Sequence, residues 1–135
     1  MNVQNDNNFS NQTSDERKIK VALYIRAKAE QPHSLERKIE DFKYKISHNP
    51  NWELICVYSD KIITGKKAYR PELKRLLKDI DDNKYDLVIF ESISAYSRYY
   101  QDVINLYKLF NEKHIDVIFE KEKINTINNT KVEVF

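Results

Sequence analysis

The order of apolar and polar positions along the chain predicts several β-strands. Apolar residues alternate with other residues from Ile19 to Ile25, the period of a strand with one buried face. Trp52 to Asp60 and Ile115 to Glu120 give further strands. Leu87 to Phe90 is an uninterrupted apolar run, as expected of a central strand buried on both faces. Val132 to Phe135 is a candidate for a last strand.

Between these predicted strands, apolar residues recur at helical spacing and predict helices. Ser34 is the expected N-cap of the first helix, which Asn49 and Pro50 end. Pro71 suits the first turn of the second helix. The apolar residues at helical spacing are Leu35, Ile39, Phe42 and Ile46, then Leu73, Leu76, Leu77 and Ile80, and finally Val103, Leu106, Tyr107 and Phe110. Strands alternating with helices predict an α/β domain with a mostly parallel sheet flanked by helices.

Length and composition indicate one small domain after a polar tail. The chain has 135 residues, enough for one core. Residues 1–17 are mostly Asn, Gln, Ser, Thr and Asp, so we expect a disordered tail before a domain over 18–135. The net charge of +2 is too small to indicate nucleic acid by itself. Without a signal peptide or an apolar run long enough to span a bilayer, the sequence predicts a cytoplasmic protein with no membrane contact.

Several classes of site find no support in the sequence. Cys56 is the single cysteine and lies in an apolar strand, which is typical of a buried structural thiol and excludes an intramolecular disulfide. His33, His48 and His114 are scattered, so we expect no metal site. No glycine-rich phosphate loop is present. We therefore expect neither a metal nor a small-molecule cofactor.

Two polar segments follow predicted strands that we expect to be neighbours. Tyr24 to Ala29 lies at the end of the first strand and includes Arg26, and Ser92 to Arg98 follows the central strand. Because parallel strands bring their carboxyl ends to one edge of the sheet, both segments should open onto the same place. Arginines gathered there are suited to a phosphate group. Each arginine alone would be read as an ordinary surface residue.

These segments resemble motifs of the serine recombinase family, which includes resolvases, invertases and the large serine integrases. The family reads Tyr-x-Arg-Val-Ser-Thr at the first place and Ser-x-Ser-Arg-Phe-Ser-Arg at the second. Further similarities are Tyr58 to Asp60 with Gly65 in an expected loop over 61–69, Arg70 to Glu72, and Phe119 to Thr126. The likeness covers 18–135 and is greatest to the catalytic domain of the large serine recombinases. It implies a resolvase-like catalytic domain.

The resemblance also implies roles for particular residues. Arg26, Arg70 and Arg98 match the family's phosphate-binding cations. Gln31 matches a glutamine after the nucleophile segment, in a loop that is shortened here, and Ser94 matches a position that holds Asp or Ser. The principal departures are Lys28 at the position of the serine nucleophile and Ala95 at the position of an arginine. Further departures are Lys38 for a helix glutamine, and Ile62 and Thr64 for a loop glycine and serine.

These departures predict a pseudo-enzyme without an intact catalytic set. An amine at Lys28 would form a phosphoramidate and not the phosphoserine ester whose reversal rejoins the strand, and Ser34 is better explained as a helix cap than as a substitute. The expected partners are DNA, through phosphate contacts, and a second copy of the chain or an intact serine recombinase. The sequence shows no DNA-binding module after the domain, so we read it as truncated. Two alternatives stay open: an active or partner-assisted strand-exchange recombinase, and a non-functional mobile-element remnant.

Three tyrosines beside the second segment leave a smaller question open. Tyr96, Tyr99 and Tyr100 could stack on bases, but packing at the start of the following helix is the interpretation that we adopt.

Overall fold

A computed structural model describes residues 17–28, 31–62 and 69–127. A five-stranded sheet in the order β3-β2-β4-β5-β6 forms its centre. The strands are β2 (Ile19–Lys28), β3 (Trp52–Ile62), β4 (Leu87–Phe90), β5 (Asp116–Phe119) and β6 (Ile124–Asn125). All neighbouring pairs are parallel except β5 with β6, so the predicted mostly parallel sheet is confirmed.

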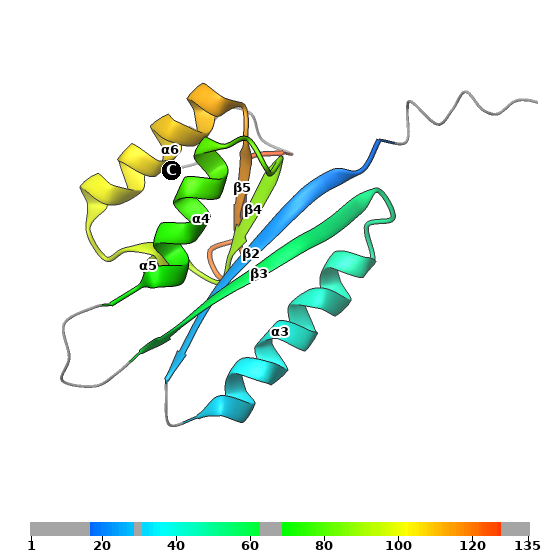
Figure 1. The fold of residues 1–135 in the computed structure, drawn as a ribbon, viewed down its shortest axis with the longest axis vertical. Helices are drawn as coiled ribbons and strands as arrows, with labels where there is room; N and C mark the ends of the chain where they lie inside the picture. Colours follow the sequence, from blue (N-terminus) through cyan, green and yellow to red (C-terminus); the bar gives the residue numbers. More distant parts are fainter. Residues whose placement is uncertain (1–16, 29–30, 63–68, 128–135) are drawn as a thin grey trace, which may run out of the picture.

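Helices cover both faces of this sheet (Figure 1). On one face α3 (Pro32–Ser47) packs Phe42 and Ile46 against Leu23 and Ile25 of β2. The other face carries α4 (Pro71–Asp81), the short α5 (Ile93–Tyr96) and α6 (Tyr100–Lys113). His114 ends α6 in the left-handed conformation with a φ of 57°.

The central strand has the buried environment that its sequence predicts. All four residues of β4, Leu87 to Phe90, are buried, and their side chains divide between the two cores. Phe90 stacks on Phe119 with ring centroids 5.3 Å apart, and Tyr24 meets Phe90 edge-on at 6.0 Å. These contacts join β2, β4 and β5 beneath α5 and α6, so they support the edge of the sheet where the polar segments lie.

At that edge, the connections after two neighbouring strands run to opposite faces of the sheet, which is called a topological switch point. The chain leaves β2 for α3 on one face, whereas it leaves β4 for α5 and α6 on the other, and β2 and β4 are neighbours. In open α/β sheets such a divergence opens a crevice at the carboxyl ends of the strands. Pairing between β2 and β4 stops at Tyr24, while β2 and β3 stay paired as far as Lys28 and Ile62. Residues 25–28 therefore lie on a two-stranded ribbon that projects beyond β4 (Figure 1).

Several local expectations are corrected by the structure. Ser34 is not the N-cap, because α3 begins at Pro32 and Gln31 occupies the cap position. A proline is favoured in the first turn because its missing N–H would have no helical partner there. Cys56 is only half-buried, and Tyr99 and Tyr100 are 74% and 80% exposed and do not pack at the start of α6.

Other expectations need extension or lie outside the described residues. Two elements, α5 and β6, are not predicted by the sequence because they are too short to show a period. The strand β3 continues to Ile62, into the expected loop. Residues 1–16 of the polar tail expected over 1–17, the loop positions Thr64 and Gly65, and the candidate strand over 132–135 lie outside the described residues.

Candidate phosphate site at the carboxyl edge of the sheet

Arg26 and Lys28 share the face of the sheet that carries α4 to α6. Tyr24 packs in the core under those helices, and strand alternation puts every second residue of β2 on the same side. Arg26 is half-buried on the projecting ribbon, and Lys28 is exposed at its end. The position that the sequence analysis assigned to the nucleophile therefore faces the same region as the first predicted phosphate ligand.

The three predicted arginines lie close enough to influence one another. Burial lowers the pKa of the Arg26 guanidinium, and the positive charges of Arg70 and Arg98 lower it further. The Arg26 Nε is buried and has no hydrogen-bond partner among the described residues. Like charges held together in a partly desolvated place favour an anion between them, because an anion would remove their repulsion and accept the free N–H.

Arg70 points inward and binds the protein itself. Its Nε and Nη2 both donate to the Tyr24 hydroxyl at 3.2 Å, and its guanidinium carbon lies 5.4 Å from the centre of that ring. Nη1 donates to the carbonyl of Tyr96 and Nη2 to the carbonyl of Ala95. A guanidinium has five N–H groups, so these contacts leave little capacity for a ligand. Arg70 therefore ties α5 to β2, a role that the sequence did not indicate.

Asp60 holds the start of α4, next to the contacts that Arg70 makes with Tyr24. Its carboxylate is 4% exposed, accepts the Tyr24 hydroxyl at 2.7 Å, and accepts the N–H groups of Glu72 and Leu73 at 3.0 Å each. A carboxylate from β3 thus serves as the cap that α4 lacks in its own sequence. Burial and this hydrogen bond raise the pKa of Tyr24, so its hydroxyl stays protonated and engaged. The signal in the sequence was an Asp at a strand end shortly before a helix-starting Pro71.

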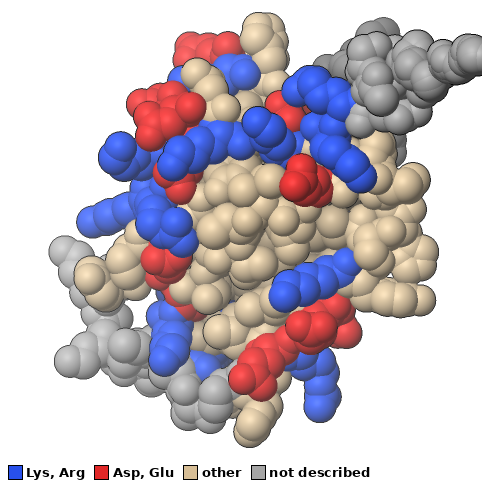
Figure 2. All heavy atoms as spheres, turned by 45° about the vertical axis from the view of Figure 1, so that its right-hand side comes forward, with Lys and Arg blue, Asp and Glu red and all other residues tan. Residues whose placement is uncertain are grey.

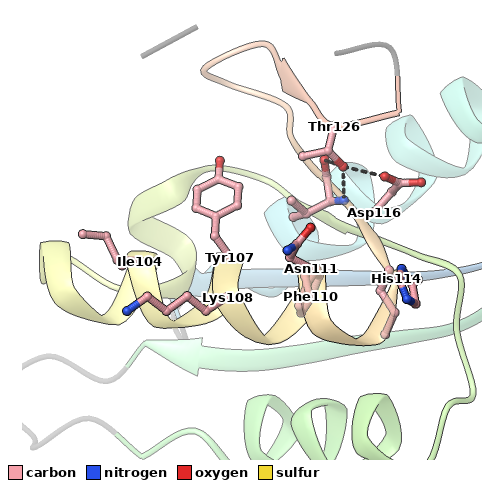
Figure 3. A pocket seen from close by; sticks show the side chains of 10 residues that line it. Ile104, Tyr107, Lys108, Phe110, Asn111, His114, Asp116 and Thr126 are labelled. Carbon is pink, nitrogen blue, oxygen red and sulfur yellow. Dashed lines mark hydrogen bonds between the residues drawn. The ribbon is translucent and has the colours of Figure 1, made fainter. Parts of the chain in front are cut away.

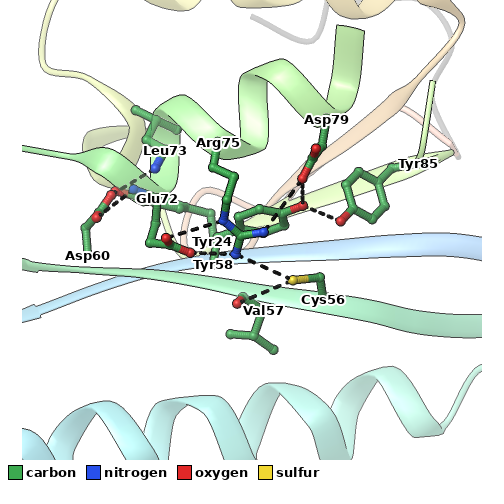
Figure 4. Close-up of polar contacts among 10 residues, drawn as sticks. All are labelled: Tyr24, Cys56, Val57, Tyr58, Asp60, Glu72, Leu73, Arg75, Asp79 and Tyr85. Atoms are coloured by element: carbon green, nitrogen blue, oxygen red, sulfur yellow. Dashed lines mark hydrogen bonds and ion pairs between the residues drawn. The ribbon is translucent and has the colours of Figure 1, made fainter. Parts of the chain in front are cut away.

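A second polar network holds the middle of α4 on β3. Figure 4 shows Tyr58, Asp79 and Tyr85 directed toward one another beneath α4. The Tyr58 hydroxyl donates to Asp79 Oδ2 at 2.5 Å and also contacts the Tyr85 hydroxyl. Arg75 lies over the Tyr58 ring, with its guanidinium carbon 4.3 Å from the ring centre. This network supports the helix that begins directly after Arg70, and it contains none of the three predicted arginines.

The second segment is organised by α5. Ser92 caps this helix by accepting the N–H of Ala95 at 3.1 Å, and its hydroxyl lies 3.1 Å from that of Ser94, which is exposed. Ala95 is buried, so the residue at the predicted arginine position contributes only packing and its carbonyl. Arg98 follows α5 and is exposed.

Gln31 and Lys38 lie on the opposite side of the sheet. Gln31 is exposed at the start of α3, and its N–H donates to the carbonyl of Lys28 at 3.0 Å. Lys38 on α3 forms an ion pair with Glu91 at 2.9 Å and donates to the carbonyl of Arg26 at 3.4 Å. This lysine therefore links the carboxyl ends of β2 and β4 from the face of the sheet that α3 covers.

A separate cavity lies elsewhere in the described part of the domain. It measures about 780 Å³ and lies between α6 and β5, lined by residues that include Tyr107, Asn111 and Thr126 (Figure 3). Thr126 donates to Asp116 at 2.8 Å within it. None of the predicted site residues lines this cavity.

Comparison with known proteins decides the family. The resolvase N-terminal domain family matches residues 21–135. The chain belongs to this family of serine recombinases. The N-terminal catalytic domain of TP901-1 integrase is 28% identical, with 82% of this chain and 84% of that chain covered and a TM-score of 0.67. No curated protein matches the sequence.

Two other solved structures share the fold of this serine recombinase domain. A resolvase family site-specific recombinase from Streptococcus pneumoniae is 23% identical, with 83% of this chain and 78% of that chain covered and a TM-score of 0.68. The C-terminal catalytic domain of ISC1926 TnpA, an IS607-like serine recombinase, is 22% identical, with 75% of this chain and 68% of that chain covered and a TM-score of 0.63. The expected resolvase-like α/β fold is thus confirmed.

Residues 17–28, 31–62 and 69–127 contain no group of three His, Cys, Asp or Glu side chains placed to hold a metal ion. No helix in these ranges is long and apolar enough to cross a membrane. Figure 2 shows one face on which Lys and Arg lie among Asp and Glu around an area without charged residues. On that face no broad basic surface marks a nucleic-acid site.

Proposed function

We propose that this serine recombinase domain binds a DNA phosphate without cutting the strand. The observation that carries the proposal is the placement of Lys28, an ammonium group at the end of β2 on the same face as Arg26. A recombinase of this family needs a hydroxyl there to form the ester that links protein and DNA. A lysine keeps a positive charge that suits a phosphate but offers no such ester.

Three hydroxyl groups of the described residues near this edge are engaged in ways that disfavour their use as a substitute nucleophile. The Tyr24 hydroxyl is held by Asp60 and Arg70, and burial raises its pKa. Ser92 caps α5, and Ser97 donates to Asp102 at 2.6 Å. Each of these groups has a structural partner that a nucleophile would have to leave.

Binding of phosphate is supported by Arg26 and Arg98. Arg26 keeps a buried Nε without a partner among the described residues, and it lies within the electrostatic reach of Arg98. A phosphodiester oxygen is a suitable acceptor for a guanidinium fork. Arg70 would help by holding this edge in place. Pairing with a second copy or with an intact serine recombinase stays a proposal of the same kind.

The binding part is tested by fluorescence anisotropy with a short labelled duplex. Arg26→Gln should weaken binding and reduce the slope of log affinity against log salt by about one, measured between about 50 and 200 mM salt. Arg37→Gln is the matched control, because Arg37 is an exposed arginine on α3. Equal effects of both substitutions would show that only general charge is involved.

The catalytic part is tested by trapping a covalent protein–DNA adduct on supercoiled DNA under denaturing conditions. The unmodified chain should give no adduct, and Lys28→Ser, alone and with Ala95→Arg, is the comparison. An adduct formed by the unmodified chain would overturn the proposal. The same assay with an intact serine recombinase added tests the partner-assisted alternative, which an adduct on this chain would support. Absence of both DNA binding and association would leave a remnant as the remaining interpretation.

A further inference from the structure

Two exposed tyrosines follow Arg98 directly. Tyr99 and Tyr100 are 74% and 80% exposed, although aromatic rings are usually at least partly covered. They lie at the junction between the segment after α5 and the first turn of α6. This is the side of the domain that carries the arginines, so the rings stand beside the candidate phosphate site.

The conformation of this junction is fixed by hydrogen bonds. The Ser97 hydroxyl donates to Asp102 at 2.6 Å and accepts the N–H of Tyr99 at 3.0 Å. Arg70 holds the preceding turn through the carbonyl of Tyr96. Aromatic rings on a backbone held in this way lose little freedom when they bind a ligand.

A groove of about 370 Å³ lies next to Tyr100. Its lining is mostly apolar and includes Ile93, Val103 and Ile104, together with Arg98 and Tyr100. Arg98 belongs both to this groove and to the group of charges around Arg26. Arg98, one of the predicted phosphate-binding cations, therefore links the groove to the candidate phosphate site, and the groove has an aromatic ring and a guanidinium at one place.

We propose that this groove takes an unstacked base of the DNA strand whose phosphate lies at Arg26 and Arg98, with Tyr100 stacking on the base. The inference rests on the proposed function. A base is a flat aromatic group that leaves the duplex at a modest cost, and stacking on tyrosine is tolerant of sequence. The cation at the groove favours a strand that carries phosphates over an uncharged protein segment.

The test compares two labelled DNA probes of equal length and sequence on one strand, one fully paired and one with a central mismatched bubble. The full chain should bind the bubble more tightly. Tyr100→Ala should weaken binding to the bubble by about 5- to 100-fold while binding to the paired probe stays unchanged. Tyr100→Phe should retain the wild-type behaviour because it keeps the ring. Tyr44→Ala is the matched control, since Tyr44 is 69% exposed on α3.

The outcomes separate this inference from the proposed function. Equal binding of both probes, unchanged in Tyr100→Ala but weakened by Arg26→Gln, would overturn the base-binding groove and leave phosphate binding intact. Failure of the wild-type chain to bind either probe would overturn the phosphate site first. If Tyr100→Ala instead alters self-association in sedimentation velocity and leaves DNA binding unchanged, the groove is a protein interface and the inference is wrong. Because Tyr100 is exposed, the substitution should leave thermal unfolding unchanged.

Discussion

Replacing Arg70 with lysine tests whether this side chain holds α5 against β2. The sequence places Arg70 among phosphate ligands, whereas the structure directs its guanidinium to the Tyr24 hydroxyl and to the carbonyls of Ala95 and Tyr96. Lysine keeps the charge but cannot reach several acceptors at once as a planar fork does. At least one of the two carbonyls would therefore lose its partner.

The expected loss follows from the number and burial of these contacts. A hydrogen bond to a charged group contributes roughly 1.5–3 kcal/mol, and a buried acceptor left unpaired costs about 1–3 kcal/mol. Arg70 is part-buried and water can replace some of its contacts, so we expect Arg70→Lys to lower the free energy of unfolding by about 2–4 kcal/mol. Arg75→Lys on α4, the helix that Arg70 precedes, is the control. Its ion pair with Glu72 is partly exposed, so we expect a loss below about 1 kcal/mol.

Urea unfolding followed by circular dichroism measures this difference, with the fluorescence of Trp52 as a second probe. Hydrogen exchange adds the location: protection should fall first in residues 92–100, which the Arg70 contacts hold in place. Unchanged stability of Arg70→Lys, combined with weaker DNA binding, would refute the reasoning. Arg70 would then act as the phosphate ligand that the sequence predicted.

Two further predictions concern the carboxylates that fasten α4. Asp60→Asn should lower the free energy of unfolding by about 1–3 kcal/mol, because the amide keeps only one accepting oxygen. Its NH2 group would face either the N–H of Glu72 or the Tyr24 hydroxyl and the N–H of Leu73, and unchanged urea unfolding would contradict this. The hydrogen bond from Tyr58 and the nearby Lys84 hold the pKa of Asp79 below its usual value, so its contribution is complete above about pH 4 and is lost as the pH falls through the lowered pKa. Thermal melts from neutral pH down to about pH 2 should show a shallower loss in Asp79→Asn than in the wild type; parallel curves would contradict this linkage.

The sequence predicted the framework of the domain because its strands have strong and simple patterns. The run from Leu87 to Phe90 has no polar residue, so only a strand buried on both faces suits it, and β4 is that strand. Helix starts were less certain, since Ser34 and Pro32 both carry a starting signal. The proline governs the start of α3 because its ring fixes a helical φ and it needs no N–H partner.

The details of the site depended on contacts between distant residues. The position of Arg70 before a helix follows from Pro71, but the direction of its side chain depends on carbonyls in α5, a helix of four residues without a readable period. The sequence likewise did not predict that the side chains of Tyr99 and Tyr100 are exposed. Aromatic residues at the start of a helix usually pack inward, and only the tertiary arrangement shows that this turn of α6 faces solvent.

The two departures from the family motif have different structural consequences. Lys28 is exposed at the end of the ribbon, so a serine could stand there without disturbing any packed side chain. Ala95 is buried in α5, its N–H is bound by Ser92, and its carbonyl is bound by Arg70. An arginine would add a long side chain at this buried position, so either the side chain would have to reach solvent or α5 would have to shift. The region around Ala95 is therefore packed for a small residue, whereas the nucleophile position is open. Since Arg70 is occupied by α5, the predicted site residues that keep a cation for a phosphate in the described part are Arg26, Arg98 and Lys28, a set suited to holding a strand.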